Sequence, residues 1–251
     1  PVFAHVPMIV GADGQRLSKR HGAVSVLEYR DQGFLPEAMR NYLLRLGWSH
    51  GDQEIFSTEE MIEFFDLGEV NRAASAFDLD KLKWLNQHYI KEADADQLGG
   101  LLTEGLEARD VDISSGPEPR AVADALRERA QTIDELVDKS LYFYSDFDEY
   151  DEGAAKKHLR PVAAGLMSDI RGRFERLEAW QAQPIHDALQ ACVEANDSKL
   201  GKIAQPLRVA VSGTAATPPI DLTLELVGKE KTLKRIDAAL GFIAARAEQG
   251  A

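Results

Sequence analysis

The sequence GADGQRLSKRHGA occupies residues 11–23, and the interpretation of the whole chain starts from it. Residues 6–10, immediately before it, are rich in β-prone side chains, while Gly11, Asp13 and Gly14 favour a turn. We therefore predict a short strand that runs into a glycine-flanked loop. The loop carries a dense group of polar and basic residues, namely Arg16, Ser18, Lys19, Arg20 and His21.

Helical patterns follow this loop. Pro36 suits the first residue of a helix that Gly47 would end, and Ser57 with Glu60 forms the capping-box pattern of a second helix. Asp78 or Asp80 can cap a third helix. Apolar residues of the second helix are expected to face the core; they are Met61, Ile62, Phe64 and Phe65.

The second half of the chain is also predicted to be helical. Residues 92–116 are richer in Ala, Asp and Gly, so we expect a domain boundary or a long connection there. One long helix is expected over residues 122–137, because apolar residues recur there at helical spacing. Further helices are expected over residues 159–180 and 184–194 and around residues 233–243. The predicted class is mainly α, with a domain over residues 1–91 and a helical region over residues 92–251 that is split near residue 145.

Composition excludes several classes of protein. The 251 residues hold 42 Asp and Glu against 29 Lys and Arg, a formal net charge of −13, so the surface is not generally basic. The single cysteine, Cys192, cannot form an internal disulfide, and we find no apolar run long enough to span a membrane. We expect a soluble, cytoplasmic, monomeric protein. Because the chain opens at Pro1 with an apolar stretch, we also expect it to be part of a longer protein.

The charge is unevenly distributed. Residues 1–50 carry six Lys and Arg against four Asp and Glu, and residues 196–251 carry eight against six. The acid excess therefore lies in the middle of the chain. A polyanion such as RNA should meet the two ends.

The basic loop has chemistry suited to phosphate. Arg and Lys can neutralise charge on a departing phosphate group, and flanking glycines let such a loop close. The chemistry alone leaves open a surface turn that happens to be basic, since the spacing of a Walker phosphate loop is absent.

Resemblance to a known family decides between these interpretations. Residues 3–23, FAHVPMIVGADGQRLSKRHGA, resemble the segment of bacterial glutamyl-tRNA synthetases that holds the KMSKS signature of class I enzymes. Similar segments follow in the family's order; they are LLRLGWSHGDQEIFS, KLKWLNQHYI, GKIAQPLRVAVSG and LELVGKEKTLKRI. The signature itself corresponds here to Arg16, Leu17, Ser18, Lys19 and Arg20, with Arg16 where the family usually has Lys.

The resemblance implies a ligase that activates glutamate with ATP and Mg²⁺ and transfers it to tRNA(Glu). Lys19 would be the ATP contact, in a loop that stabilises the departing pyrophosphate. Residues 1–91 would hold the loop and a helical stem-contact domain, and residues 92–251 the helical anticodon-binding region. The family's Rossmann-type catalytic domain would precede this chain, so we expect the chain alone to hold no cofactor and to be inactive.

The resemblance also places the residues that meet the anticodon. They are Gln205, Arg208, Thr217, Pro218 and Ile220. Such residues can read the edges of splayed bases and pack against their faces. Pro219 stands where related sequences usually have Gly.

Other chemistries are weakly supported. The histidines at positions 21, 50, 88, 158 and 186 lack metal-ligand spacing, so we expect no metal site. Cys192 and Ser212 lack the context of a nucleophile. A freestanding RNA-binding module and an acidic helical scaffold remain as alternative functions. A glutaminyl-tRNA synthetase is disfavoured, because the strands of its anticodon-binding barrels are not evident after residue 91.

Overall fold

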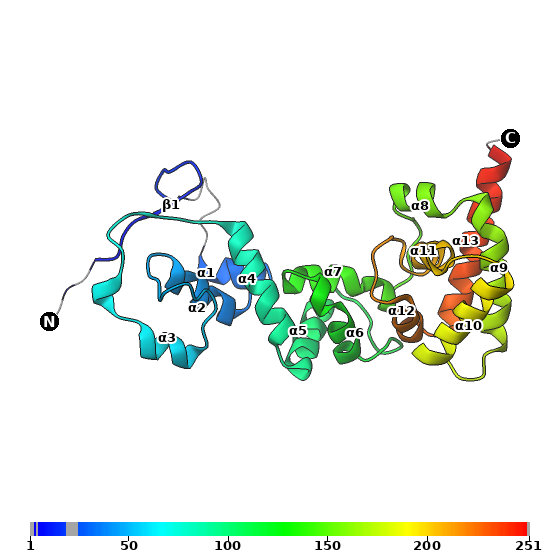
Figure 1. The fold of residues 1–251 in the computed structure, drawn as a ribbon, viewed down its shortest axis with the longest axis horizontal. Coiled ribbons are helices and arrows are strands. Elements are labelled where there is room, and N and C mark those ends of the chain that lie inside the picture. The colour runs from blue at the N-terminus through cyan, green and yellow to red at the C-terminus, as the bar shows by residue number, and fades with distance from the viewer. Residues whose placement is uncertain (1–2, 4, 19–24, 250–251) are drawn as a thin grey trace. The chain divides into compact units, whose positions relative to one another are not determined.

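The computed structural model describes residues 3, 5–18 and 25–249, and these residues are largely helical (Figure 1). The strands are β1 (Ile9–Val10) and β2 (Ser75–Ala76), and the 3-10 helices are η2 (Leu67–Glu69) and η3 (Arg127–Arg129). The α-helices are α1 (Val26–Asp31), α2 (Pro36–Arg45), α3 (Thr58–Phe64), α4 (Leu79–Glu92), α5 (Ala95–Glu107), α6 (Pro119–Leu126), α7 (Ile133–Tyr144), α8 (Glu152–His158), α9 (Pro161–Arg176), α10 (Ala182–Ala195), α11 (Leu200–Ser212), α12 (Ile220–Val227) and α13 (Lys229–Gln249). The predicted mainly helical class is confirmed.

The chain forms two compact units. Unit 1 comprises residues 1–105 and 127–138, and unit 2 comprises residues 106–126 and 139–251. Among the described residues, no helix combines the length and the apolar character needed to cross a membrane.

Local sequence determines where the helices of unit 1 begin. Pro36 is the first residue of α2, where its missing N–H costs nothing. Ser57 and Glu60 form the predicted capping box of α3, and Asp78 caps α4 by accepting a hydrogen bond from the Lys81 N–H at 3.1 Å. These three predicted helix starts are confirmed.

A buried amide joins α4 to the rest of unit 1. Asn86 is fully buried, and its side-chain oxygen accepts a hydrogen bond from the Leu35 N–H at 2.8 Å. Its side-chain nitrogen donates to the carbonyls of Gly33 at 3.3 Å and Gln131 at 2.6 Å. A buried polar side chain is stable only when it is paired in this way, so Asn86 fixes α4 against two distant segments.

The segment expected as a long connection contains a helix. Asp94 caps α5 by accepting hydrogen bonds from the N–H groups of Asp96 and Gln97. Leu98, Leu102 and Leu106 are buried at successive helical turns. Residues 95–107 are thus not a long connection, and glycines that interrupt the stripe obscured the helix; the alternative expectation, a boundary, agrees with the division between the two units after residue 105. Gly105 is required by packing, since a Cβ there would lie 2.5 Å from the Val137 side chain.

The single long helix expected over residues 122–137 is also wrong. The chain leaves α6 after Leu126, passes through η3 and starts again at α7. Thr132 and Glu135 explain this break, because the Glu135 N–H donates to the Thr132 hydroxyl and the Gln131 N–H donates to the Glu135 carboxylate. The pattern Thr-x-x-Glu is itself a start signal, and the apolar periodicity obscured it.

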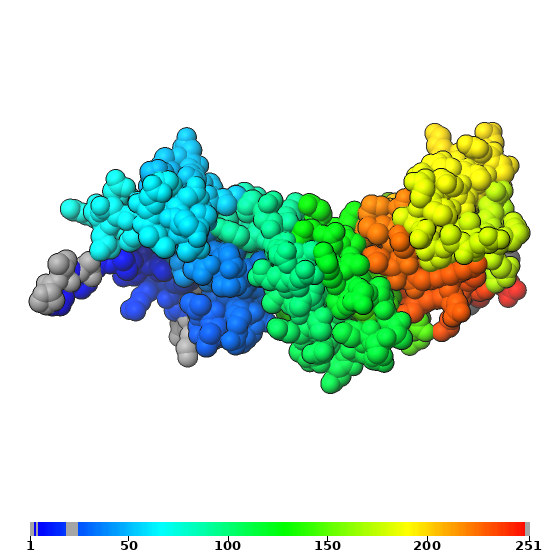
Figure 2. All heavy atoms as spheres, turned by 90° about the horizontal axis from the view of Figure 1, so that it is seen from below, coloured from blue at the N-terminus to red at the C-terminus, as the bar shows by residue number. Residues whose placement is uncertain are grey.

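Helix α3 lies at the surface of unit 1 instead of in its core (Figure 2). No residue of α3 is buried; Ile62 is 78% exposed, and Phe65 just beyond the helix is 42% exposed. Met61 and Phe65 line an apolar groove of about 440 Å³ together with Val6 and Leu43. The expectation that the apolar residues of this helix face the core is therefore wrong.

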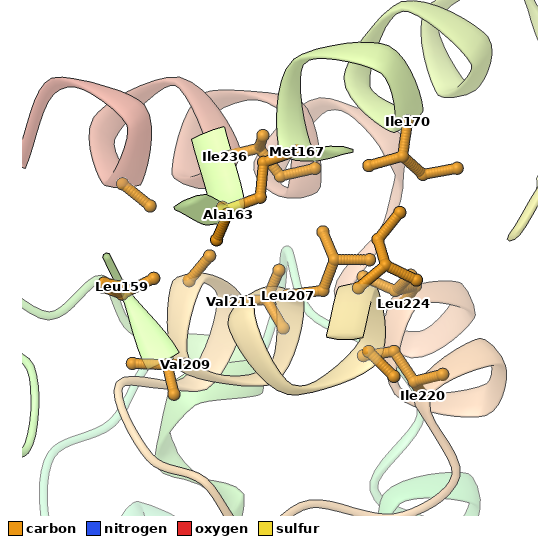
Figure 3. Close-up of a cluster of buried hydrophobic side chains, with 14 of the residues drawn as sticks. Leu159, Ala163, Met167, Ile170, Leu207, Val209, Val211, Ile220, Leu224 and Ile236 are labelled. Atoms are coloured by element: carbon orange, nitrogen blue, oxygen red, sulfur yellow. The ribbon is translucent and has the colours of Figure 1, made fainter. Parts of the chain in front are cut away.

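The core of unit 2 brings together helices α9, α11 and α13 (Figure 3). Met167 and Ile170 on α9 face Leu207 and Val211 on α11, and Ile236 on α13 joins them. Each of these side chains is fully buried. Helix α11 thus lies inside the core, and only a narrow strip of it reaches the surface.

Gly33→Ala should lower the free energy of unfolding by roughly 1–3 kcal/mol. Gly33 has a φ of +81°, and an added Cβ would lie 2.6 Å from the Asp134 backbone nitrogen. Urea unfolding followed by circular dichroism measures the change. Gly100→Ala is the matched control: Gly100 lies within α5 with open space around it, so alanine should raise stability by about 0.5–1 kcal/mol. Equal effects of the two substitutions would contradict the packing described for Gly33.

Candidate functional site

The predicted phosphate loop in unit 1 follows β1. Strands β1 and β2 and residues 16–17 are joined by hydrogen bonds and form the platform at the base of this loop. Strand β1 pairs in parallel with β2, and the Phe77 N–H donates to the Val10 carbonyl at 2.8 Å. On the other edge of β1, the Leu17 N–H donates to the Ile9 carbonyl at 2.9 Å. The chain therefore leaves β1 and returns alongside it, which fixes the base of the loop.

A glycine turn makes this return possible. Gly14 has a φ of +74°, a conformation that glycine adopts without strain, and its N–H donates to the Gly11 carbonyl at 3.0 Å. Arg16 is exposed on the returning strand, and Ser18 is half-buried. The remaining predicted signature residues, Lys19 and Arg20, lie outside the described residues.

A cleft of about 870 Å³ adjoins the turn. Gly11, Leu17, Tyr29 and residues 76–80 are among the residues that line this cleft. The sequence did not predict the contribution of residues 76–80. Strand β2 is only two residues long, which is too short to produce a recognisable pattern.

Two predicted anticodon-contacting residues lie on the exposed strip of α11 in unit 2. Gln205 and Arg208 are three residues apart, so they share one face of the helix, and both are half-buried. The residues between and beside them are buried in the core.

The structure joins Arg208 directly to another predicted residue. Its Nε donates to the Thr217 hydroxyl at 3.1 Å, and that hydroxyl donates to the Pro218 carbonyl at 2.9 Å. Thr217 and Pro218 are buried, and Ile220, at the start of α12, is 5% exposed and packs in the core. Hydrogen bonds thus link three of the five predicted residues, Arg208, Thr217 and Pro218, and Gln205 and Arg208 are the most accessible of the five.

A buried guanidinium supports the end of α11. Arg235 on α13 is 6% exposed and donates to the carbonyls of Val211, Tyr142 and Ser145. It also donates to the Asp146 carboxylate at 3.3 Å. Nothing in the spacing of the sequence singled out Arg235, because its partners lie 24–93 residues away.

The acidic residues of the stretch after α7, residues 146–152, are exposed, but two of their carboxylates have partners within unit 2. Asp146 pairs with Lys234 at 2.7 Å and with Arg235, and hydrogen bonding to Lys234 is the main reason that the pKa of Asp146 is lowered. Phe147 lies beneath the Arg235 guanidinium at 4.9 Å, and Asp151 caps α8. Asp146 therefore links this stretch to α13, and Asp151 starts α8.

Other candidate chemistries gain no support from the geometry. Within the described residues, no group of three or more His, Cys, Asp or Glu side chains is placed to hold a metal ion. Ser212 donates back to the Arg208 carbonyl at 2.8 Å, as serines commonly do within a helix.

Comparisons with known proteins agree with both halves of this arrangement. The family model "Anticodon binding domain" matches residues 80–240, and the model "tRNA synthetases class I (E and Q), catalytic domain" matches residues 1–84. These matches identify the chain as part of a class I aminoacyl-tRNA synthetase.

Individual relatives narrow the family. The chain is 52% identical to Glutamate--tRNA ligase 1 of Alkalilimnicola ehrlichii and 53% identical to Glutamate--tRNA ligase 1 of Nitrosococcus oceani, over 97% of its own length and 52% of theirs. A crystal structure of a glutamate tRNA ligase from Elizabethkingia meningosepticum matches with a TM-score of 0.85 at 30% identity, covering 97% of this chain and 52% of that one. The chain belongs to the bacterial glutamate–tRNA ligase family, and it spans about half the length of the curated relatives it matches.

Cys192 should be a slow nucleophile in the native protein. It is fully buried, and burial together with its hydrogen bond to Asp169 raises the pKa of the thiol to about 11. Because its pKa is raised, less thiolate is present at pH 8, by about a hundredfold relative to an ordinary cysteine. Reaction with a thiol reagent before and after unfolding in urea measures this. A native rate equal to the unfolded rate would contradict the burial.

Proposed function

We propose that this chain is the tRNA-reading part of an enzyme that activates glutamate with ATP and transfers it to tRNA(Glu). The bond between Arg208 and Thr217 carries the proposal, because it holds a guanidinium at the surface of a domain whose family binds anticodons. Anticodon bases are single-stranded, so their edges are open to such a donor.

The five predicted residues have different roles in binding the anticodon. Gln205 and Arg208 offer accessible donors and acceptors from one helix face and read base edges. Thr217 holds the Arg208 side chain in place, while Pro218 and Ile220 form the apolar base of the site. A fixed guanidinium discriminates between bases better than a mobile one, because less conformational entropy is lost on binding.

The signature loop belongs to the ATP-dependent half of the reaction. The predicted loop residues 16–20 start from the β1 platform, and the exposed Arg16 side chain fits the stabilisation of departing pyrophosphate. We retain Lys19 as the ATP contact, and ATP accompanied by Mg²⁺ as a substrate of the complete enzyme. A monomer in the cytoplasm also remains our prediction.

Arg208→Ala should weaken binding of tRNA(Glu) about tenfold to a hundredfold, and should barely affect a tRNA with a scrambled anticodon. Binding of the 251-residue chain to both RNAs at two salt concentrations measures this difference. Arg176→Ala is the control, because it removes an exposed cation at the end of α9. Equal weakening for both RNAs would show that Arg208 contacts phosphate and does not read bases.

A further inference from the structure

The two longest stretches of the chain without Asp or Glu are residues 153–168 and residues 198–220. Each contains three Lys or Arg residues, although acidic residues predominate in the chain as a whole. Both stretches belong to unit 2. The second contains Gln205 and Arg208, the most accessible residues of the proposed anticodon site.

The two acid-free stretches pack against each other. The first covers most of α8 and the start of α9, and both of these helices contact α11, which the second stretch contains. Leu159 and Ala163 from the first share one core with Leu207 and Val209 from the second (Figure 3). This packing joins two positively charged segments that lie far apart in the sequence.

Five cations on these stretches are exposed. They are Lys156, Lys157, Arg160, Lys199 and Lys202. None of their side chains has a hydrogen bond or ion pair with the part of the chain that the structure describes. Two of these charges act on a neighbouring side chain. Burial, and then the charges of Lys157 and Arg160, lower the pKa of His158.

Most other Lys and Arg side chains of unit 2 make hydrogen bonds or ion pairs with residues of the same unit. Lys229 donates to the carbonyls of Glu175 and Leu177, and Lys231 donates to that of Phe143. Arg171 and Arg173 pair with acidic side chains. The five exposed cations therefore differ from these neighbours in having no structural partner to explain them.

The spacing on α11 relates the exposed lysines to the proposed anticodon site. Lys202, Gln205 and Arg208 lie at intervals of three residues, so they occupy one helix face with about 5–6 Å between successive Cβ atoms. Lys199 precedes them by another three residues. A strand of RNA whose bases meet Gln205 and Arg208 would therefore bring its phosphates past Lys202, and Lys199 lies at the N-terminal end of the same helix.

We propose that Lys156, Lys157, Arg160, Lys199 and Lys202 form a phosphate-binding surface that holds the RNA backbone beside the anticodon site. This inference rests on the proposed function and adds to it a set of contacts that read no sequence. Such contacts supply affinity and register, while base-edge contacts supply specificity. They also reconcile tRNA binding with a net charge of −13.

The test is the salt dependence of tRNA(Glu) binding by the 251-residue chain. Each phosphate contact contributes a slope of roughly −0.7 in log affinity against log salt for single-stranded RNA. Lys199→Gln with Lys202→Gln should therefore reduce the slope by about 1.4, and Lys156→Gln, Lys157→Gln and Arg160→Gln together by about 2. Both variants should weaken the correct and the scrambled anticodon equally.

Arg176→Gln is the charge-matched control. Arg176 is also exposed, but it lies at the far end of α9 between Glu175 and Glu178, so its loss should leave the slope unchanged. A slope unchanged in either multiple variant, or lowered equally by Arg176→Gln, overturns this inference while anticodon preference persists. If the unsubstituted chain binds no tRNA(Glu), both this inference and the proposed function fail. Circular dichroism confirms that each variant folds.

Discussion

The buried guanidinium of Arg235 is the constraint on which the architecture of unit 2 depends. Burial lowers the pKa of this guanidinium, and hydrogen bonding to the Asp146 carboxylate opposes that shift. Its donors are shared between the carbonyls near the end of α7 and the Val211 carbonyl near the end of α11. Loss of this side chain would leave several buried acceptors without a donor, which is why it fixes the ends of two helices at once.

The proposed anticodon site depends on that anchorage. Helix α11 ends at Gly213, whose φ of +77° turns the chain, and the Gly213 carbonyl accepts a hydrogen bond from the Asp151 N–H at 2.8 Å. The chain then returns to place Thr217 against Arg208 at 3.1 Å. The same helix presents the exposed Lys202 on the side that carries Gln205. Helix α11 thus packs in the core, leads into the turn at Gly213 and carries Gln205 and Arg208.

Sequence alone predicted local features well and distant ones poorly. The starts at Pro36, Ser57 and Asp78 were predictable, because caps act within four residues. The roles of Asn86 and Arg235 were not, since their partners are tens of residues away. The family resemblance supplied the candidate site residues, and the structure added the bond that joins Arg208 to Thr217. Apolar spacing failed at residues 127–132, where a capping signal competes with helical periodicity.

Base-specific chemical probing of tRNA(Glu) bound to the 251-residue chain tests directly whether unit 2 reads the anticodon. We expect the anticodon bases to become protected while the acceptor end stays reactive, because Gln205 and Arg208 belong to the anticodon-binding region. Protection should extend along the backbone of the anticodon arm. Unchanged reactivity of the anticodon bases in a saturated complex, with protection elsewhere in the tRNA, would show that Gln205 and Arg208 do not read the anticodon.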